Sequence, residues 1–127
     1  MKYGFSKTTD YSFEEAIQKV TDELKKEGFG VLTTIDVKDT LKNKLNVDFK
    51  KYTILGACNP PLAHQALQTE EELGLLLPCN VVVYEKEGKS VVSIFDPMVM
   101  AHIIDNPGMK TVADEVKKKL ERVIEAV

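Results

Sequence analysis

Two amphipathic segments, one near each end of the chain, constrain the fold more than any other feature. In the first, Ser12 and Glu15 form the capping-box pattern of a helix N-terminus, and Gly28 supplies a left-handed stop. A second helix is expected from about residue 109 to the end of the chain. Apolar residues recur at helical spacing and form one stripe on each: Phe13, Ala16, Ile17, Val20 and Leu24, then Val112, Val116, Leu120, Val123 and Val127. Two long one-sided helices need an apolar sheet face against which to bury these stripes.

The segments before the first helix and between the two helices include five with the composition of strands, which would form that sheet. The expected strands are residues 2–9, 31–35, 52–57, 76–86 and 89–95. Glu87 and Gly88 form a tight turn between the last two strands, which makes them an antiparallel hairpin. The sequence therefore predicts one α+β domain, residues 1–127, with a mainly antiparallel sheet of about five strands and the two long helices on one face.

Three short helices are expected in the connections, because each begins with a capping side chain. Asp36 opens a helix that runs to about Leu45. Asn59 and Asp96 each precede a proline, and a capping residue followed by proline is typical of a first helical turn.

Composition excludes several classes of protein. The 127 residues are 43% hydrophobic and carry a net charge of −3, without the basic face that a nucleic-acid binder needs. No apolar run approaches the roughly 20 residues of a membrane span, and no leader-like apolar segment opens the chain. We therefore expect a cytoplasmic protein that binds neither nucleic acid nor membrane, with Cys58 and Cys79 as reduced thiols.

The sequence holds no glycine-rich phosphate loop, zinc-protease helix or hydrolase nucleophile motif. One constellation remains. If the last three strands are sequential antiparallel neighbours, their ends bring five polar side chains to one edge of the sheet: Cys58, Asn59, Cys79, Asn80 and Asp96. A helix N-terminus at that edge would favour anions and could lower a thiol pKa. These residues are the predicted site for a small polar or anionic ligand.

Each of these residues also has a purely structural interpretation. The cysteines are more typical of small, inert core residues than of a redox or metal site. Asn59 and Asp96 suit helix capping, and Asn80 either bonds to the neighbouring loop or faces a ligand. A zinc site would use the soft ligands of the chain, although their spacing matches no zinc motif: Cys58, Cys79, His64 and His102.

Three stretches resemble the signature of a bacterial and archaeal family called domain of unknown function 302. They are Tyr52 to Pro60, Gly74 to Val81 and Asp96 to Met98, and Ile35-Asp36 after the first helix also fits. The resemblance implies a TATA-binding-protein-like α+β fold with the order strand, helix, four strands, helix. It also implies a homodimer, and it implies no settled activity.

The leading hypothesis is a homodimeric, non-catalytic ligand-binding or accessory module whose site lies at the ends of the third to fifth strands. A thiol-dependent redox enzyme or sensor that uses Cys58 and Cys79 is the main alternative. A Cys/His metal-binding protein and a purely structural partner protein are the others.

Overall fold

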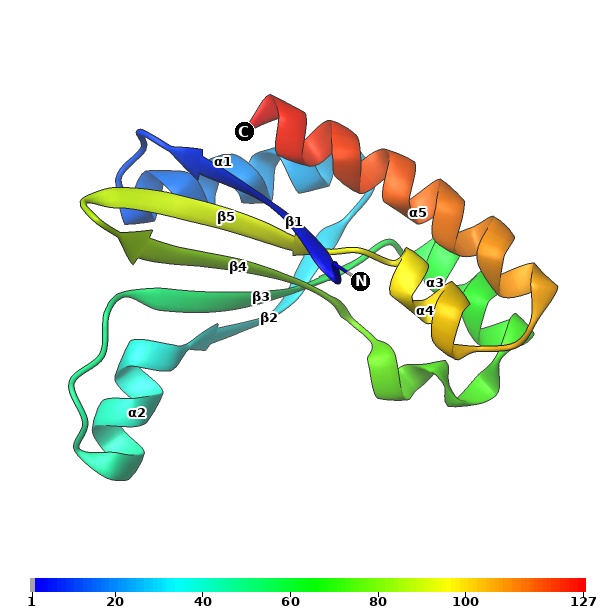
Figure 1. Ribbon diagram of the computed structural model, residues 1–127, viewed down its shortest axis with the longest axis horizontal. Helices are drawn as coiled ribbons and strands as arrows, with labels where there is room; N and C mark the ends of the chain where they lie inside the picture. The colour runs from blue at the N-terminus through cyan, green and yellow to red at the C-terminus, as the bar shows by residue number, and fades with distance from the viewer. Residues whose placement is uncertain (1) are drawn as a thin grey trace.

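The computed structural model describes residues 2–127 as a five-stranded sheet with its long helices on one face (Figure 1). The predicted α+β class is therefore confirmed. The strands run in the order β1-β5-β4-β3-β2, and every pair of neighbours is antiparallel. They are β1 (Gly4–Thr9), β2 (Gly30–Asp36), β3 (Tyr52–Cys58), β4 (Cys79–Lys86) and β5 (Lys89–Phe95).

Residues 2–127 also form six helical segments. The helices α1 and α5 cover one face, while α3, η1 and α4 gather at one end of the sheet beside the first half of α5 (Figure 1). From the other end α2 projects away from the helix-covered face (Figure 1). The helices are α1 (Phe13–Lys26), α2 (Val37–Leu45), α3 (Pro60–Thr69), the 3-10 helix η1 (Glu71–Leu76), α4 (Met98–Ile103) and α5 (Pro107–Ala126).

Local side-chain chemistry fixes α1 as the sequence predicts. Both arms of the capping box form: the Glu15 backbone N–H donates to Ser12 Oγ and the Ser12 N–H donates to Glu15 Oε1, each at 3.2 Å. After the helix, Gly28 takes a positive φ of 85°, and the Phe29 N–H donates to the Leu24 carbonyl at 2.9 Å. These ends set the helix so that its apolar stripe faces the sheet.

The hydrophobic core fills the space between the sheet and the α1–α5 layer. Alternate side chains of β3, β4 and β5 point into it, which is the period-two pattern of a half-buried sheet. The fully buried members from both layers include Val20, Leu24, Leu55, Val81, Val83, Val92, Ile94, Leu120 and Val123.

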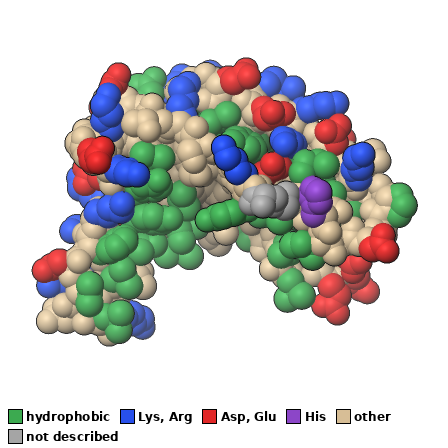
Figure 2. Space-filling view, in the orientation of Figure 1, with side chains coloured by type: hydrophobic (Ala, Val, Ile, Leu, Met, Phe, Trp, Pro, Cys, Tyr) green, Lys and Arg blue, Asp and Glu red, His purple; other side chains and the backbone are tan. Residues whose placement is uncertain are grey.

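Among residues 2–127, no helix covers the opposite side of the sheet (Figure 1). We call it the open face, defined by the outward side chains Tyr52, Ile54, Val82, Tyr84 and Ser93. The rings of Tyr52 and Tyr84 stack on neighbouring strands with centroids 5.3 Å apart. Figure 2 shows an arched molecule, with hydrophobic side chains along the hollow beneath the sheet and on the part that α2 forms at the lower left.

Several element boundaries differ from the sequence prediction by one or two residues, and the start of β4 differs by three. The strand expected from residue 76 begins at Cys79, and η1 occupies 71–76 instead. Pro78 has no backbone N–H to give to a strand ladder, and Leu73 is buried by the 3-10 turn. Helix α5 begins at Pro107 rather than 109, because the Asn106 side chain caps it by accepting from the Gly108 N–H at 3.0 Å.

No helix among residues 2–127 combines the length and the apolar character that crossing a bilayer requires.

Candidate functional site

The edge of the sheet where β3 ends and β4 begins brings the two cysteines close together. Ala57 pairs with Cys79 across these strands, so Cys58 lies one residue beyond that pair. Strand β5 returns to the same edge, because Val81 pairs with Ile94 and Asp96 directly follows the end of β5. The three segments around positions 58, 79 and 96 thus reach one edge, as the antiparallel connectivity predicts.

An apolar pocket of about 350 Å³ lies at this edge, between the sheet and the cluster of α3, η1, α4 and α5. Cys58, Asn59 and Cys79 all line it. Thr33 and Asn59 are the polar residues of its wall besides the thiols. The remainder of the wall is aliphatic and aromatic, and includes Phe29, Leu62, Ala66, Met100, Val112 and Val116. Such a lining suits an apolar molecule, and it offers an anion no positive charge.

The Asn59 side chain is occupied by the fold. Its Oδ1 accepts from the Leu62 backbone N–H at 3.3 Å and so caps α3, and its Nδ2 donates to the Glu27 carbonyl, also at 3.3 Å. The residue is buried. Asn59 therefore ties the start of α3 to the end of α1, and its polar atoms are engaged before any ligand arrives.

Asp96 does not line the apolar pocket. Its Oδ1 accepts from the Met98 backbone N–H at 2.9 Å, and its Oδ2 lies 3.1 Å from Lys117 Nζ on α5. The carboxylate thus orients the start of α4 and links that end of the sheet to α5. The N-cap of α4 is Pro97, so Asp96 lies one residue before the capping position that the sequence predicted, although its side chain still accepts a hydrogen bond from the first turn.

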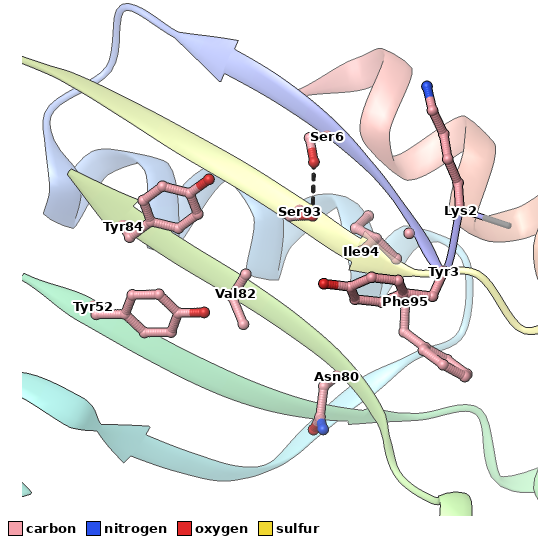
Figure 3. A pocket seen from close by; sticks show the side chains of 11 residues that line it. Lys2, Tyr3, Ser6, Tyr52, Asn80, Val82, Tyr84, Ser93, Ile94 and Phe95 are labelled. Carbon is pink, nitrogen blue, oxygen red and sulfur yellow. Dashed lines mark hydrogen bonds between the residues drawn. The ribbon is translucent and has the colours of Figure 1, made fainter. Parts of the chain in front are cut away.

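Asn80 faces the opposite side of the sheet from Cys79, because neighbouring residues of a strand alternate. It lies exposed at one end of a shallow hollow of about 640 Å³ on the open face. Figure 3 shows this hollow, with Tyr52 and Tyr84 on adjacent strands, Val82 between them and Asn80, and a hydrogen bond between the Ser6 and Ser93 hydroxyls. The five predicted ligand-binding residues therefore do not form one site. Cys58, Asn59 and Cys79 line the apolar pocket, Asn80 lies at the hollow on the open face, and Asp96 bonds to the start of α4 and to α5.

Comparison with known proteins agrees with the sequence motifs. The family model described as "Domain of unknown function DUF302" matches residues 5–127. The chain belongs to this family. It is also similar to a solved structure, described as the crystal structure of an uncharacterized conserved protein DUF302 from Bacillus stearothermophilus. The identity is 28% and the TM-score 0.92, over 99% of this chain and 98% of that one. No curated protein matches the chain.

The four candidate zinc ligands of this DUF302 chain do not assemble. Among residues 2–127 no group of three or more His, Cys, Asp or Glu side chains lies close enough to hold a metal ion. His64 on α3 and His102 on α4 are both exposed, whereas the cysteines line the apolar pocket. A tetrahedral site needs all its ligands to converge on one point, and these side chains are on different surfaces.

Burial in the apolar pocket keeps the Cys79 thiol protonated. Cys79 is 6% exposed, and the two cysteines are not joined by a disulfide. Loss of solvation raises the pKa of Cys79 from 9.0 to about 11, and repulsion from a Cys58 thiolate adds to the rise. Since the thiolate is the nucleophile and the metal ligand, a thiol that stays neutral at physiological pH suits neither task. Cys79 behaves as a small apolar part of the pocket wall.

This pKa predicts that alkaline pH destabilises the fold through Cys79. Between pH 9.0 and about 11 the unfolded chain has released a proton that the folded chain retains, so the free energy of unfolding falls as pH rises. The loss reaches about 3 kcal/mol in total. Urea unfolding of the unmodified chain and of Cys79→Ala at several pH values measures it. Parallel pH profiles for the two proteins would contradict the assignment.

Most of the pocket wall was not identified from the sequence as part of a site. Met100, Val112 and Val116 have the pattern of ordinary core residues, and they come from segments far from the cysteines. The Ala63-to-Leu67 stretch of α3 likewise shows only an apolar helical stripe. An apolar pocket is built from the residue types of a core, so no residue type marks it in advance.

Proposed function

We propose that this DUF302 protein is a homodimeric, non-catalytic binding module that holds a small, neutral, apolar molecule in the pocket at the ends of β3 and β4. The observation that carries the proposal is the composition of the pocket wall. Ligand sites are typically concave and mainly apolar, with a few polar groups that orient the ligand, and 350 Å³ is within the usual size range.

The ligand class follows from the groups that the wall offers. The Asn59 side-chain amide is hydrogen-bonded to the backbone of Leu62 and of Glu27, and the Cys79 thiol is neutral. Asp96 is engaged by Lys117 outside the pocket. An anion entering here would lose its hydration without gaining a charged partner, which is costly in an apolar environment. The pocket thus favours a neutral ligand over the anionic one that the strand-end pattern suggests.

A cytoplasmic location and a TATA-binding-protein-like fold are further parts of this proposal. A cytoplasmic location agrees with the free thiols of Cys58 and Cys79. The likeness to TATA-binding protein remains a prediction from the family resemblance.

A matched pair of fluorescent probes tests the proposal. N-phenylnaphthylamine is neutral, and anilinonaphthalene sulfonate carries nearly the same rings with an added negative charge. We expect the neutral probe to bind at least about tenfold more tightly, which corresponds to about 1.4 kcal/mol. The measurement is a fluorescence titration of the folded protein with each probe.

A pocket-filling variant shows where the neutral probe binds. Ala63 lines the pocket on α3, so Ala63→Phe places a ring inside it, whereas Ala126→Phe adds the same ring to an exposed position near the end of α5. We expect Ala63→Phe to weaken binding of the neutral probe at least about tenfold and Ala126→Phe to leave it unchanged. Equal binding of both probes, or binding indifferent to Ala63→Phe in a folded variant, would overturn the proposal.

A further inference from the structure

The open face is unusual for a sheet face that meets water. Antiparallel sheets with one solvated face normally place polar side chains on it. Here β3 and β4 present Tyr52, Ile54, Val82 and Tyr84, which are all partly buried, and β2 presents the exposed Ile35. A contiguous apolar surface of this kind usually marks an interaction site.

Two projections border this face. At one end is the α2 projection, residues 37–50, which comprises α2 and the loop after it; at the other is the η1 projection, residues 70–76 (Figure 1). Figure 2 shows both as the legs of an arch with the hollow between them. The α2 projection exposes Leu45, Val47 and Phe49 with relative exposures of 66%, 44% and 38%. It is therefore an apolar protrusion beside an apolar hollow on the same chain.

The two projections differ in charge. The α2 projection exposes four lysines and two aspartates (Lys38, Lys42, Lys44 and Lys50 against Asp39 and Asp48), so lysines outnumber acids there. The η1 projection bears exposed Glu71 and Glu72 and no basic residue. Acidic side chains gather at the tip of the η1 projection, at the lower right in Figure 2. Lys42 pairs with Asp48 of the same projection at 3.1 Å. Within residues 2–127, neither Lys44 nor the two glutamates form an ion pair. The α2 projection thus has positive charge, and the η1 projection negative charge, that no ion pair among the described residues neutralises.

We propose that the open face binds a second copy of this chain around a two-fold axis that sets the α2 projection of each copy against the η1 projection of the other. A two-fold interface must be self-complementary, and a surface with both a protrusion and a hollow meets that condition. The apolar side chains of each α2 projection then enter the hollow of the partner subunit.

Charge selects the axis. Two copies can place their open faces together by either of two rotations. One axis runs parallel to the line that joins the two projections, and the other runs perpendicular to that line, in the plane between the faces. The first rotation sets lysines against lysines and glutamates against glutamates, which costs free energy. The second sets the α2 lysines against Glu71 and Glu72 in both halves of the interface. This inference rests on the homodimeric part of the proposed function and is independent of what the apolar pocket holds.

A charge-swap experiment tests the interface. One variant carries Lys42→Glu and Lys44→Glu, and the other carries Glu71→Lys and Glu72→Lys. Each variant alone sets like charges against each other in both halves of the interface, so we expect its dimer dissociation constant to rise at least about tenfold. Mixing the two variants restores opposite charges in both halves and is expected to recover a heterodimer. Light scattering after size exclusion, over a range of concentrations, reports the mass.

A matched control carries Lys25→Glu and Lys110→Glu, two exposed lysines on the long helices of the covered face, and is expected to dimerise as the unmodified chain does. Circular dichroism checks that every variant is folded. An unmodified chain that stays monomeric would overturn this inference and the homodimeric part of the proposed function together. A dimer that tolerates both charge-swapped variants would overturn the inference and leave the homodimer standing.

Discussion

We expect Leu55→Ala to lower the free energy of unfolding by about 3 to 4 kcal/mol, the range of truncations that leave a cavity in a rigid core. Leu55 lies in the middle of β3, pairs with Val81 across the sheet and is 1% exposed. Its side chain is held between the sheet and the helices, so its neighbours cannot collapse into the space that it leaves. Urea denaturation of the variant and of the unmodified chain, with equal slopes, gives the difference directly.

Ile103→Ala is the matched control for this truncation, because it removes the same number of carbon atoms from a side chain that is 63% exposed on α4. We expect its effect to stay below about 0.5 kcal/mol, as for other surface substitutions. Similar losses for the two variants would show that β3 is not at the centre of the core.

The second large effect is expected at Gly56. A Cβ atom at this position would lie 2.8 Å from Pro78 Cγ and would clash with the Thr33 hydroxyl. The proline ring cannot rotate away, and both neighbours border the apolar pocket. Gly56→Ala should therefore cost about 3 kcal/mol, at the upper end of the usual overpacking penalty. The shift of the urea midpoint measures it.

Gly30→Ala supplies the comparison, because Gly30 also lies in the β2–β3 pair but a Cβ atom there meets nothing within 4 Å. We expect that change to be neutral or slightly stabilising, since alanine has fewer unfolded conformations to lose. Equal destabilisation by the two substitutions would mean that backbone freedom, and not the close approach at Gly56, decides the effect.

The parts of the fold that could be predicted from sequence are those fixed by local signals. The capping box at Ser12 and Glu15, the stop at Gly28 and the cap at Asn59 each depend on residues a few positions apart, and each forms as predicted. The start of β4 depends on more distant contacts. Leu75, Leu76 and Leu77 have the composition of a strand, but packing of Leu73 and the missing N–H of Pro78 place β4 later.

The candidate site was also predictable only where it depends on strand connectivity. Antiparallel connectivity was enough to bring Cys58 beside Cys79. The alternation of a strand also implies that Asn80 faces away from Cys79, so this separation could have been anticipated. The apolar character of the pocket could not be, because it arises where α3, α4 and α5 pack against the end of the sheet, and sequence spacing does not define how helices from distant segments meet.

A crystal structure of the protein soaked with N-phenylnaphthylamine would test the central claim most directly. We predict electron density for the probe's rings in the pocket of about 350 Å³, in contact with Ala63, Ala66 and Met100, with the Asn59 hydrogen bonds unchanged. Density for the rings on the open face beside Tyr52 and Tyr84, with the pocket empty, would contradict the proposed ligand site.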